Sequence, residues 1–121
     1  MARPPALERC VLDVLWRGGD WSVRSVLAAV DPTLAYTTIA TVLARLHAKG
    51  KVVREKDGIS WVYRAARSRD EAVAGEVARM LKRADGASEP LLVAFLDEVE
   101  AVDPDALERL EALIRARRES S

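Results

Sequence analysis

The sequence predicts a mainly α-helical protein that carries one small β-hairpin. Two observations lead to this fold class. Apolar residues recur at helical spacing in three stretches before residue 50, and again after residue 66. Between these regions, KVVREK and ISWVYRA are short, rich in β-branched and aromatic residues, and separated by Asp57-Gly58. The 121 residues therefore divide into helices, a hairpin and further helices.

Three helices are predicted before the hairpin. The first covers residues 5 to 17, between two prolines and a glycine pair. The second follows Ser22, a favourable N-cap, and ends at Val30 before an Asp-Pro pair. The third lies within residues 35–50, with Gly50 at the position of a C-terminal cap. We expect their apolar positions to form one core, to which Trp16 and Trp21 also contribute. These positions are Leu7, Val11, Leu12, Val14, Leu15, Val23, Val26, Leu27, Val30, Ile39, Val42, Leu43 and Leu46.

The hairpin prediction rests on the dipeptide Asp57-Gly58. A type I′ turn needs a positive φ at both of its central residues, which Asp-Gly accommodates well. With this loop, the register places Lys56 opposite Ile59, Arg54 opposite Trp61, and Val52 opposite Tyr63. Arg54 is then expected to stack on Trp61. Asp20-Trp21 is expected to add one short strand pairing.

The polar face of the third predicted helix contains no acidic residue. Thr38, Thr41 and Arg45 recur at helical spacing opposite the apolar stripe, and Thr37 stands at the helix start. A helix that enters a DNA major groove needs such a face, because it must approach closely and form hydrogen bonds. The backbone N–H groups and hydroxyl at Thr37 can meet a phosphate. An ordinary helix packed on both sides is the alternative.

Basic residues are concentrated in the N-terminal half of the chain. Residues 1–65 contain ten Lys and Arg against six Asp and Glu, whereas residues 66–121 contain nine against thirteen. This asymmetry favours a polyanion-binding part joined to a part that avoids the polyanion, although differences of this size also arise by chance. Together with the order of helices and hairpin, it predicts a winged helix-turn-helix DNA-binding domain over residues 1–66. The phosphate candidates are Lys49, Arg54, Lys56 and Arg64.

Residues 67–121 are predicted to form a helical dimerisation domain. Ser68 and Glu71 fit a capping box, Ser88 starts a further helix, and Asp103-Pro104 is the expected start of the last one. Three short amphipathic helices make a thin core by themselves, so pairing with a second copy is the economical solution. Packing back onto the N-terminal domain is the alternative. The candidate dimer residues are Val77, Leu81, Leu92, Phe95, Leu96, Val99, Leu107, Leu110 and Ile114.

Composition argues against an enzyme or a membrane protein. The single Cys10 and the single His47 have no Asn or Gln to orient a nucleophilic pair, and both sit in helical patterns explained by packing. No cofactor or metal site is predicted, because the sequence has no cysteine-rich cluster, and no paired carboxylates, metal cluster or glycine-rich phosphate loop at a suitable spacing. No apolar run approaches the length of a membrane helix, and the N-terminal residues do not resemble a signal peptide. We expect a cytoplasmic protein.

The segment LAYTTIATVLARLHAKGKVVREKDGISWVYRA resembles the penicillinase-repressor family of BlaI/MecI type, and LERCVLDVLWRGGDWSVRSVL is similar to its first two helices. The resemblance covers essentially the whole chain. It implies a homodimeric winged-helix transcriptional repressor whose N-terminal domains bind double-stranded DNA at the two halves of a dyad-symmetric operator. It also implies that the C-terminal helices form the dimer.

The same resemblance implies a possible protease partner. Family members are cut by a sensor-linked metalloprotease between Asn and Phe, and the matching stretch here is LVAFLDE, with Ala94 in place of Asn and Phe95 retained. A copper-responsive branch carries paired C-terminal cysteines, which this sequence lacks. A winged-helix protein-interaction module without DNA binding is the alternative function. Such a module would show an acidic or apolar face on the third helix.

Overall fold

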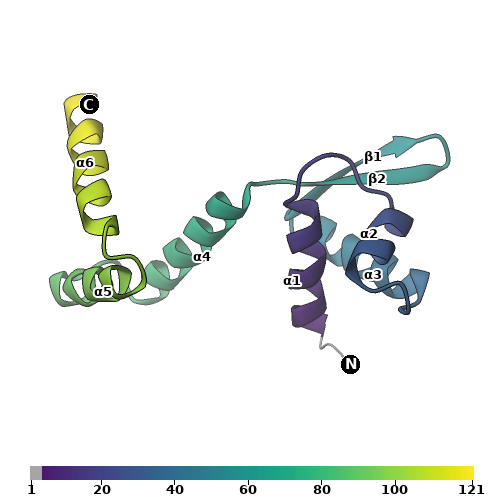
Figure 1. Ribbon diagram of the computed structural model, residues 1–121, viewed down its shortest axis with the longest axis horizontal. Coiled ribbons are helices and arrows are strands. Elements are labelled where there is room, and N and C mark those ends of the chain that lie inside the picture. Colours follow the sequence, from purple (N-terminus) through teal and green to yellow (C-terminus); the bar gives the residue numbers. More distant parts are fainter. Residues whose placement is uncertain (1–3) are drawn as a thin grey trace. The chain divides into compact units, whose positions relative to one another are not determined.

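The computed structural model describes residues 4–121, which form six helices and one two-stranded antiparallel hairpin (Figure 1), as the sequence predicts. The chain divides into two compact units, and the boundary between Gly75 and Glu76 lies within a helix. In chain order the elements are α1 (Pro4–Leu15), α2 (Val23–Val30), α3 (Tyr36–Ala48), β1 (Val52–Asp57), β2 (Ser60–Ala65), α4 (Arg69–Arg83), α5 (Glu89–Val102) and α6 (Ala106–Glu119).

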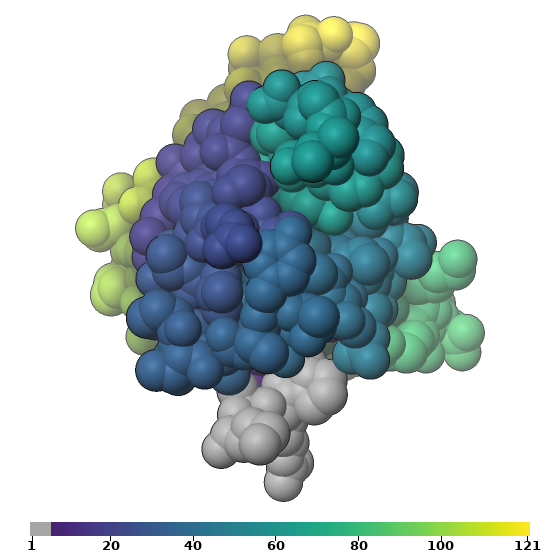
Figure 2. All heavy atoms as spheres, turned by 90° about the vertical axis from the view of Figure 1, so that its right-hand side faces the viewer, coloured from purple at the N-terminus to yellow at the C-terminus, as the bar shows by residue number. Residues whose placement is uncertain are grey.

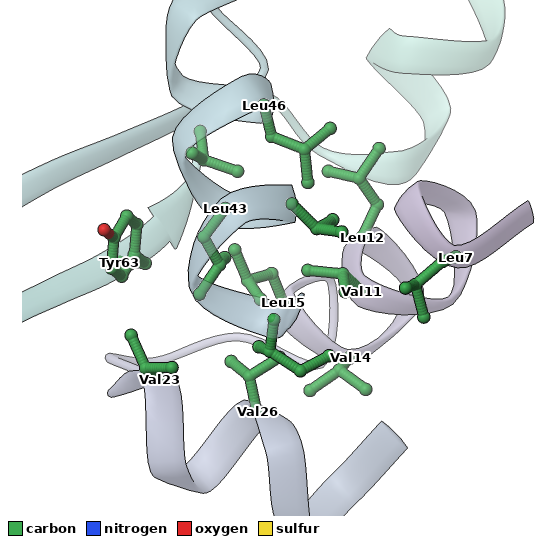
Figure 3. Packing of buried hydrophobic residues seen from close by; sticks show 13 residues of the cluster. Leu7, Val11, Leu12, Val14, Leu15, Val23, Val26, Leu43, Leu46 and Tyr63 are labelled. Atoms are coloured by element: carbon green, nitrogen blue, oxygen red, sulfur yellow. The ribbon is translucent and has the colours of Figure 1, made fainter. Parts of the chain in front are cut away.

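The core of the N-terminal unit forms where α1, α2 and α3 meet the base of the hairpin. The apolar stripe of α3 is confirmed, since Ile39, Leu43 and Leu46 are completely buried. Figure 3 shows the side chains of α1 and α3 interdigitating, with Tyr63 of β2 closing one side. Each such side chain contributes about 1.5–3 kcal/mol when it is fully removed from water. This burial fixes which face of α3 remains outside.

Hydrogen bonds at the helix ends set the lengths of α2 and α3. The Ser22 hydroxyl accepts from the Ser25 N–H at 3.0 Å, and the Ser25 hydroxyl accepts from the Ser22 N–H at 2.9 Å. At the end of α3, Gly50 has a φ of +75°, and the Lys51 N–H donates to the Leu46 carbonyl at 2.9 Å. This is a Schellman ending, in which glycine takes the left-handed conformation without a Cβ penalty. The predicted caps at Ser22 and Gly50 are confirmed.

The predicted register of the hairpin is wrong by two residues. Asp57 pairs with Ser60, so the loop is Gly58-Ile59 and not Asp57-Gly58. Only Gly58 has a positive φ, at +66°, which is the pattern of a type II′ turn and spares Asp57 the left-handed conformation. Consequently Val52 pairs with Ala65, Arg54 with Tyr63, and Lys56 with Trp61. An even shift keeps every side chain on its predicted face of the ribbon.

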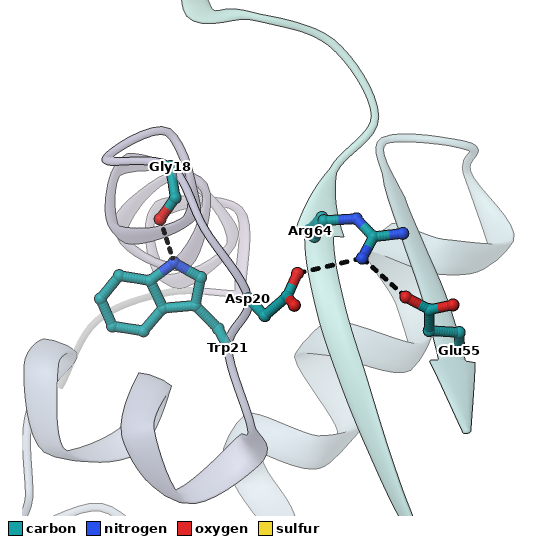
Figure 4. A network of polar contacts seen from close by, with 5 residues as sticks. All are labelled: Gly18, Asp20, Trp21, Glu55 and Arg64. Atoms are coloured by element: carbon teal, nitrogen blue, oxygen red, sulfur yellow. Dashed lines mark hydrogen bonds and ion pairs between the residues drawn. The ribbon is translucent and has the colours of Figure 1, made fainter. Parts of the chain in front are cut away.

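Trp21 attaches the turn after α1 to the hairpin. Its backbone forms one strand bridge, as expected, and the partner is Tyr63, with N···O distances of 3.0 and 2.7 Å. Its indole N–H donates to the Gly18 carbonyl at 3.0 Å (Figure 4). Trp16 and Trp21 are half-buried and pack against the core, as predicted. Trp21 thereby links β2 to the segment that joins α1 and α2.

The second unit contains α5 and α6, which contact each other. The predicted caps at Ser68 and Ser88 are confirmed, because Ser68 accepts from the Glu71 N–H at 3.1 Å and Ser88 accepts from the Leu91 N–H at 3.3 Å. The predicted start of the last helix at Asp103-Pro104 is wrong. Asp103 instead caps the end of α5, and its carboxylate accepts from the Asp105 N–H and from Arg109. α6 therefore begins only at Ala106.

Two smaller expectations are also corrected. Cys10 and His47 were expected to be packing residues, but both are exposed, because they fall outside the apolar stripes of α1 and α3.

Within residues 4–121, no helix is long and apolar enough to cross a bilayer.

Candidate nucleic-acid interface

The outer face of α3 presents the four side chains predicted to contact DNA. Thr37, Thr38, Thr41 and Arg45 are all exposed, on the side of the helix opposite the buried stripe. The N-cap residue, Ala35, provides no side-chain hydrogen bond, and the first turn of α3 contains no acidic residue. The start of α3 is therefore open to a negatively charged group.

The hairpin presents two cations around one aromatic ring. The Cζ atom of Arg54 lies 4.2 Å from the centroid of the Trp61 ring, and the Nζ atom of Lys56 lies 4.7 Å from it. The predicted Arg54–Trp61 stack is confirmed, although it is a diagonal contact and not a direct cross-strand pair. Strand alternation places these three side chains on the ribbon face that also carries the buried Tyr63.

Arg64 lies on the opposite face of the ribbon and is already engaged (Figure 4). Its Nη1 atom is 2.7 Å from a Glu55 carboxylate oxygen and 3.0 Å from one of Asp20. Two hydrogen bonds raise the pKa of Arg64 above its ordinary value. The bond to Glu55 has the larger effect and the bond to Asp20 the smaller one. Lys49 is also paired, with its Nζ atom 2.9 Å from the carboxylate of Glu8.

These ion pairs sort the predicted phosphate contacts into two groups. Lys49 and Arg64 neutralise carboxylates of the same unit. Among the residues that the structure describes, no carboxylate lies within ion-pair distance of Arg45, Arg54 or Lys56. Figure 2 shows α2 and α3 in blue with the teal hairpin on one face of the unit. Of the five predicted cations, the three without a carboxylate partner among the described residues belong to α3 and to this hairpin.

Sequence reasoning missed one further pair at the start of α3. The Cζ atom of Arg24, on α2, lies 5.5 Å from the centroid of the Tyr36 ring, and both side chains are exposed. The eleven residues between them hide this contact from any helical periodicity. The available signal was the helix-turn-helix order itself, which predicts that α2 and α3 pack against each other.

A helix-turn-helix pair followed by a β-hairpin places the N-terminal unit in the winged helix class. The family model for the penicillinase repressor matches residues 5–116, nearly the whole chain. The chain therefore belongs to the penicillinase repressor family, a family of transcriptional regulators and not of enzymes.

Curated relatives agree with this assignment. The chain is 40% identical over 115 residues to the "Transcriptional regulator BlaI" of Mycobacterium tuberculosis strain CDC 1551 / Oshkosh, covering 91% of this chain and 83% of the relative. The same values hold for the protein of that name from strain ATCC 25618 / H37Rv. A solved structure titled for the DNA recognition and protein interaction domains of HOP2 aligns with 51% of this chain and 95% of its own, at 19% identity and a TM-score of 0.42.

Proposed function

We propose that the protein is a homodimeric transcriptional repressor that binds a dyad-symmetric DNA operator through α3 and the hairpin. The observation that carries this proposal is the exposed, acid-free face of α3, opposite a stripe that is completely buried. Thr38 and Thr41 offer hydroxyls and methyls to base edges, and Arg45 can bond a guanine or a phosphate. Thr37 meets a phosphate at the start of the helix. The relatives' name, transcriptional regulator, supports the same role.

Arg54 and Lys56 are the backbone contacts of the hairpin in this proposal. The Trp61 ring holds both cations, and no carboxylate of the described chain competes for them. Phosphate contacts of this kind fix register and orientation but carry no sequence information. Specificity therefore belongs to the α3 face, and the hairpin supplies affinity. Lys49 and Arg64 are secondary candidates, because each must first leave an ion pair.

The second unit supports the homodimer. No side chain in Glu76–Ser121 is buried, yet α5 and α6 carry large apolar residues, including Phe95 at 43% exposure and Ile114 at 49%. Exposed apolar surface on this scale is typical of an interaction site. A second copy would cover it with the same surface, as in most symmetric oligomers. Of the predicted dimer residues, four are exposed and the other five are half-buried; the exposed ones are Leu92, Phe95, Leu96 and Ile114.

The protease partner implied by the family resemblance extends this proposal. Ala94 and Phe95 lie in the middle of α5, and both are exposed. Cutting there would divide the dimerisation unit and release the operator. Because a protease binds an extended backbone, the middle of α5 must first unwind. Co-expression with a membrane metalloprotease of the same genome, followed by mass analysis of the fragments, tests this step.

Selection of genomic fragments by the purified full-length chain tests the proposed function. We expect the enriched fragments to share a dyad-symmetric site, with half-sites about one helical turn or a multiple of it apart. Enrichment without a common site, or no retained DNA, would refute the proposal. Retention of a protein partner by a chain that binds no DNA would establish the interaction module instead.

A further inference from the structure

A cation is fixed beside the first turn of α3 by contact with an aromatic ring. Arg24 is the second residue of α2 and Tyr36 is the first of α3, so their stack joins the starts of both helices of the helix-turn-helix pair. Tyr36 is 47% exposed and is followed directly by Thr37 and Thr38. The guanidinium therefore lies at the edge of the surface that carries the threonines.

The surroundings of Arg24 leave its charge available. Among the described residues, no carboxylate is within ion-pair distance of it, and the first turns of α2 and α3 contain no acid. A ring that supports a guanidinium by its flat face leaves the N–H edges free. Those edges match the geometry of a phosphate group.

A second arginine–aromatic stack in the same unit provides a comparison. The Cζ atom of Arg9 lies 5.3 Å from the centroid of the Trp16 ring, nearly the separation found for Arg24. However, the Nε atom of Arg9 donates to the Asp13 carboxylate at 3.2 Å, within the same helix. Stacking therefore does not by itself leave a free cation, and Arg9 is a matched control on α1.

We propose that Arg24 is a DNA-backbone contact, held by the Tyr36 ring against a phosphate that flanks the bases facing α3. This inference rests on the proposed function and assigns it two residues outside the predicted set. As a phosphate contact, Arg24 strengthens binding to every duplex by the same factor. Tyr36 is a positioning residue, because it acts through the guanidinium that it supports.

Fluorescence anisotropy across a range of KCl concentrations tests the proposal, using a fragment selected by the protein and a scrambled duplex of equal length. We expect Arg24→Ala to reduce the slope of log affinity against log salt by about 1.8 on both duplexes, because the dimer loses two phosphate contacts. Arg24→Lys, which keeps the charge, and Arg9→Ala should retain the wild-type slope. Tyr36→Ala should weaken binding of the wild-type chain but not of the Arg24→Ala chain.

Several results would overturn the inference. An unchanged slope in Arg24→Ala would exclude a phosphate contact, and a loss confined to the selected fragment would indicate base reading. An equal effect of Tyr36→Ala in both backgrounds would exclude positioning through Arg24. Circular dichroism melting confirms that each exposed substitution leaves the fold intact. Equal affinity of the wild type for both duplexes would refute the proposed function, but the slope comparison would still decide the role of Arg24.

Discussion

At the scale of single residues, the ion pairs decide which cations are available to DNA. Charge alone makes Arg54, Lys56 and Arg64 equivalent as phosphate candidates, since all three belong to one basic hairpin. The structure separates them, because alternation turns Arg64 to the other face, where Asp20 and Glu55 hold it. Pairing of this kind cannot be inferred from local sequence, as Asp20 lies 44 residues upstream of Arg64.

This separation predicts different salt responses for two arginines of the same hairpin. We expect Arg54→Ala to reduce the log–log salt slope of DNA binding by about 1.8, because the dimer loses two phosphate contacts. Arg64→Ala should leave the slope unchanged. The measurement is a salt titration of both variants on the same duplex. A reduced slope for Arg64→Ala with a wild-type slope for Arg54→Ala would contradict the assignment.

At the scale of elements, local signals predicted where most helices begin and end. Ser22, Ser68 and Ser88 cap helices as their sequence context indicates, since the required N–H donors lie within three residues. The failures occurred where one residue had two possible partners. Asp103 serves the end of α5 and the next turn instead of the start of α6. In the hairpin, Gly58 is the first of the two central turn residues and not the second, as predicted, and the register differs accordingly.

The capping box of α4 predicts a pH-dependent contribution to stability. The Glu71 carboxylate accepts from the Ser68 N–H at 3.1 Å, and hydrogen bonding by Ser68 lowers the pKa of Glu71 below its ordinary value of 4.5. The folded pKa is below the unfolded one, so the stabilisation is complete above pH 4.5 and is lost as the pH falls through the folded value.

Thermal unfolding of the wild type and of Glu71→Gln measures this contribution. The difference in melting temperature between them should be largest near neutral pH and should shrink on acidification below pH 4.5. Asp70→Asn is the control, because Asp70 is the residue before Glu71 and its carboxylate accepts no hydrogen bond from Ser68. A difference that grows on acidification would contradict the capping role of Glu71.

At the scale of the whole molecule, the two units differ in how much apolar surface they bury. The N-terminal unit contains every completely buried side chain among the described residues, and its core was predicted almost residue by residue. Helical periodicity succeeds there because one stripe of each helix is buried. The same stripes on α5 and α6 remain exposed in one chain, and the proposed second copy explains their apolar character.

The dimer proposal predicts that substitution of one exposed apolar residue of α5 disrupts the dimer and that substitution of another does not. Phe95 belongs to the predicted dimer set, whereas Val102, at 87% exposure, does not. Phe95→Glu would bury a charge at the interface and should shift the protein to the mass of one chain. Val102→Glu should remain dimeric. Sedimentation measures both, and a wild-type chain that sediments as a monomer would contradict the proposal.

The central claim is that the acid-free face of α3 reads a DNA sequence, and the ratio of operator to scrambled affinity tests it most directly. At about 0.15 M salt, the wild type should bind the selected fragment at least ~10³-fold more tightly than the scrambled duplex. Arg45→Ala and Thr41→Ala should reduce this ratio while leaving the thermal stability of the N-terminal unit unchanged, because both side chains are exposed. Equal affinity of the wild type for the two duplexes would contradict the claim.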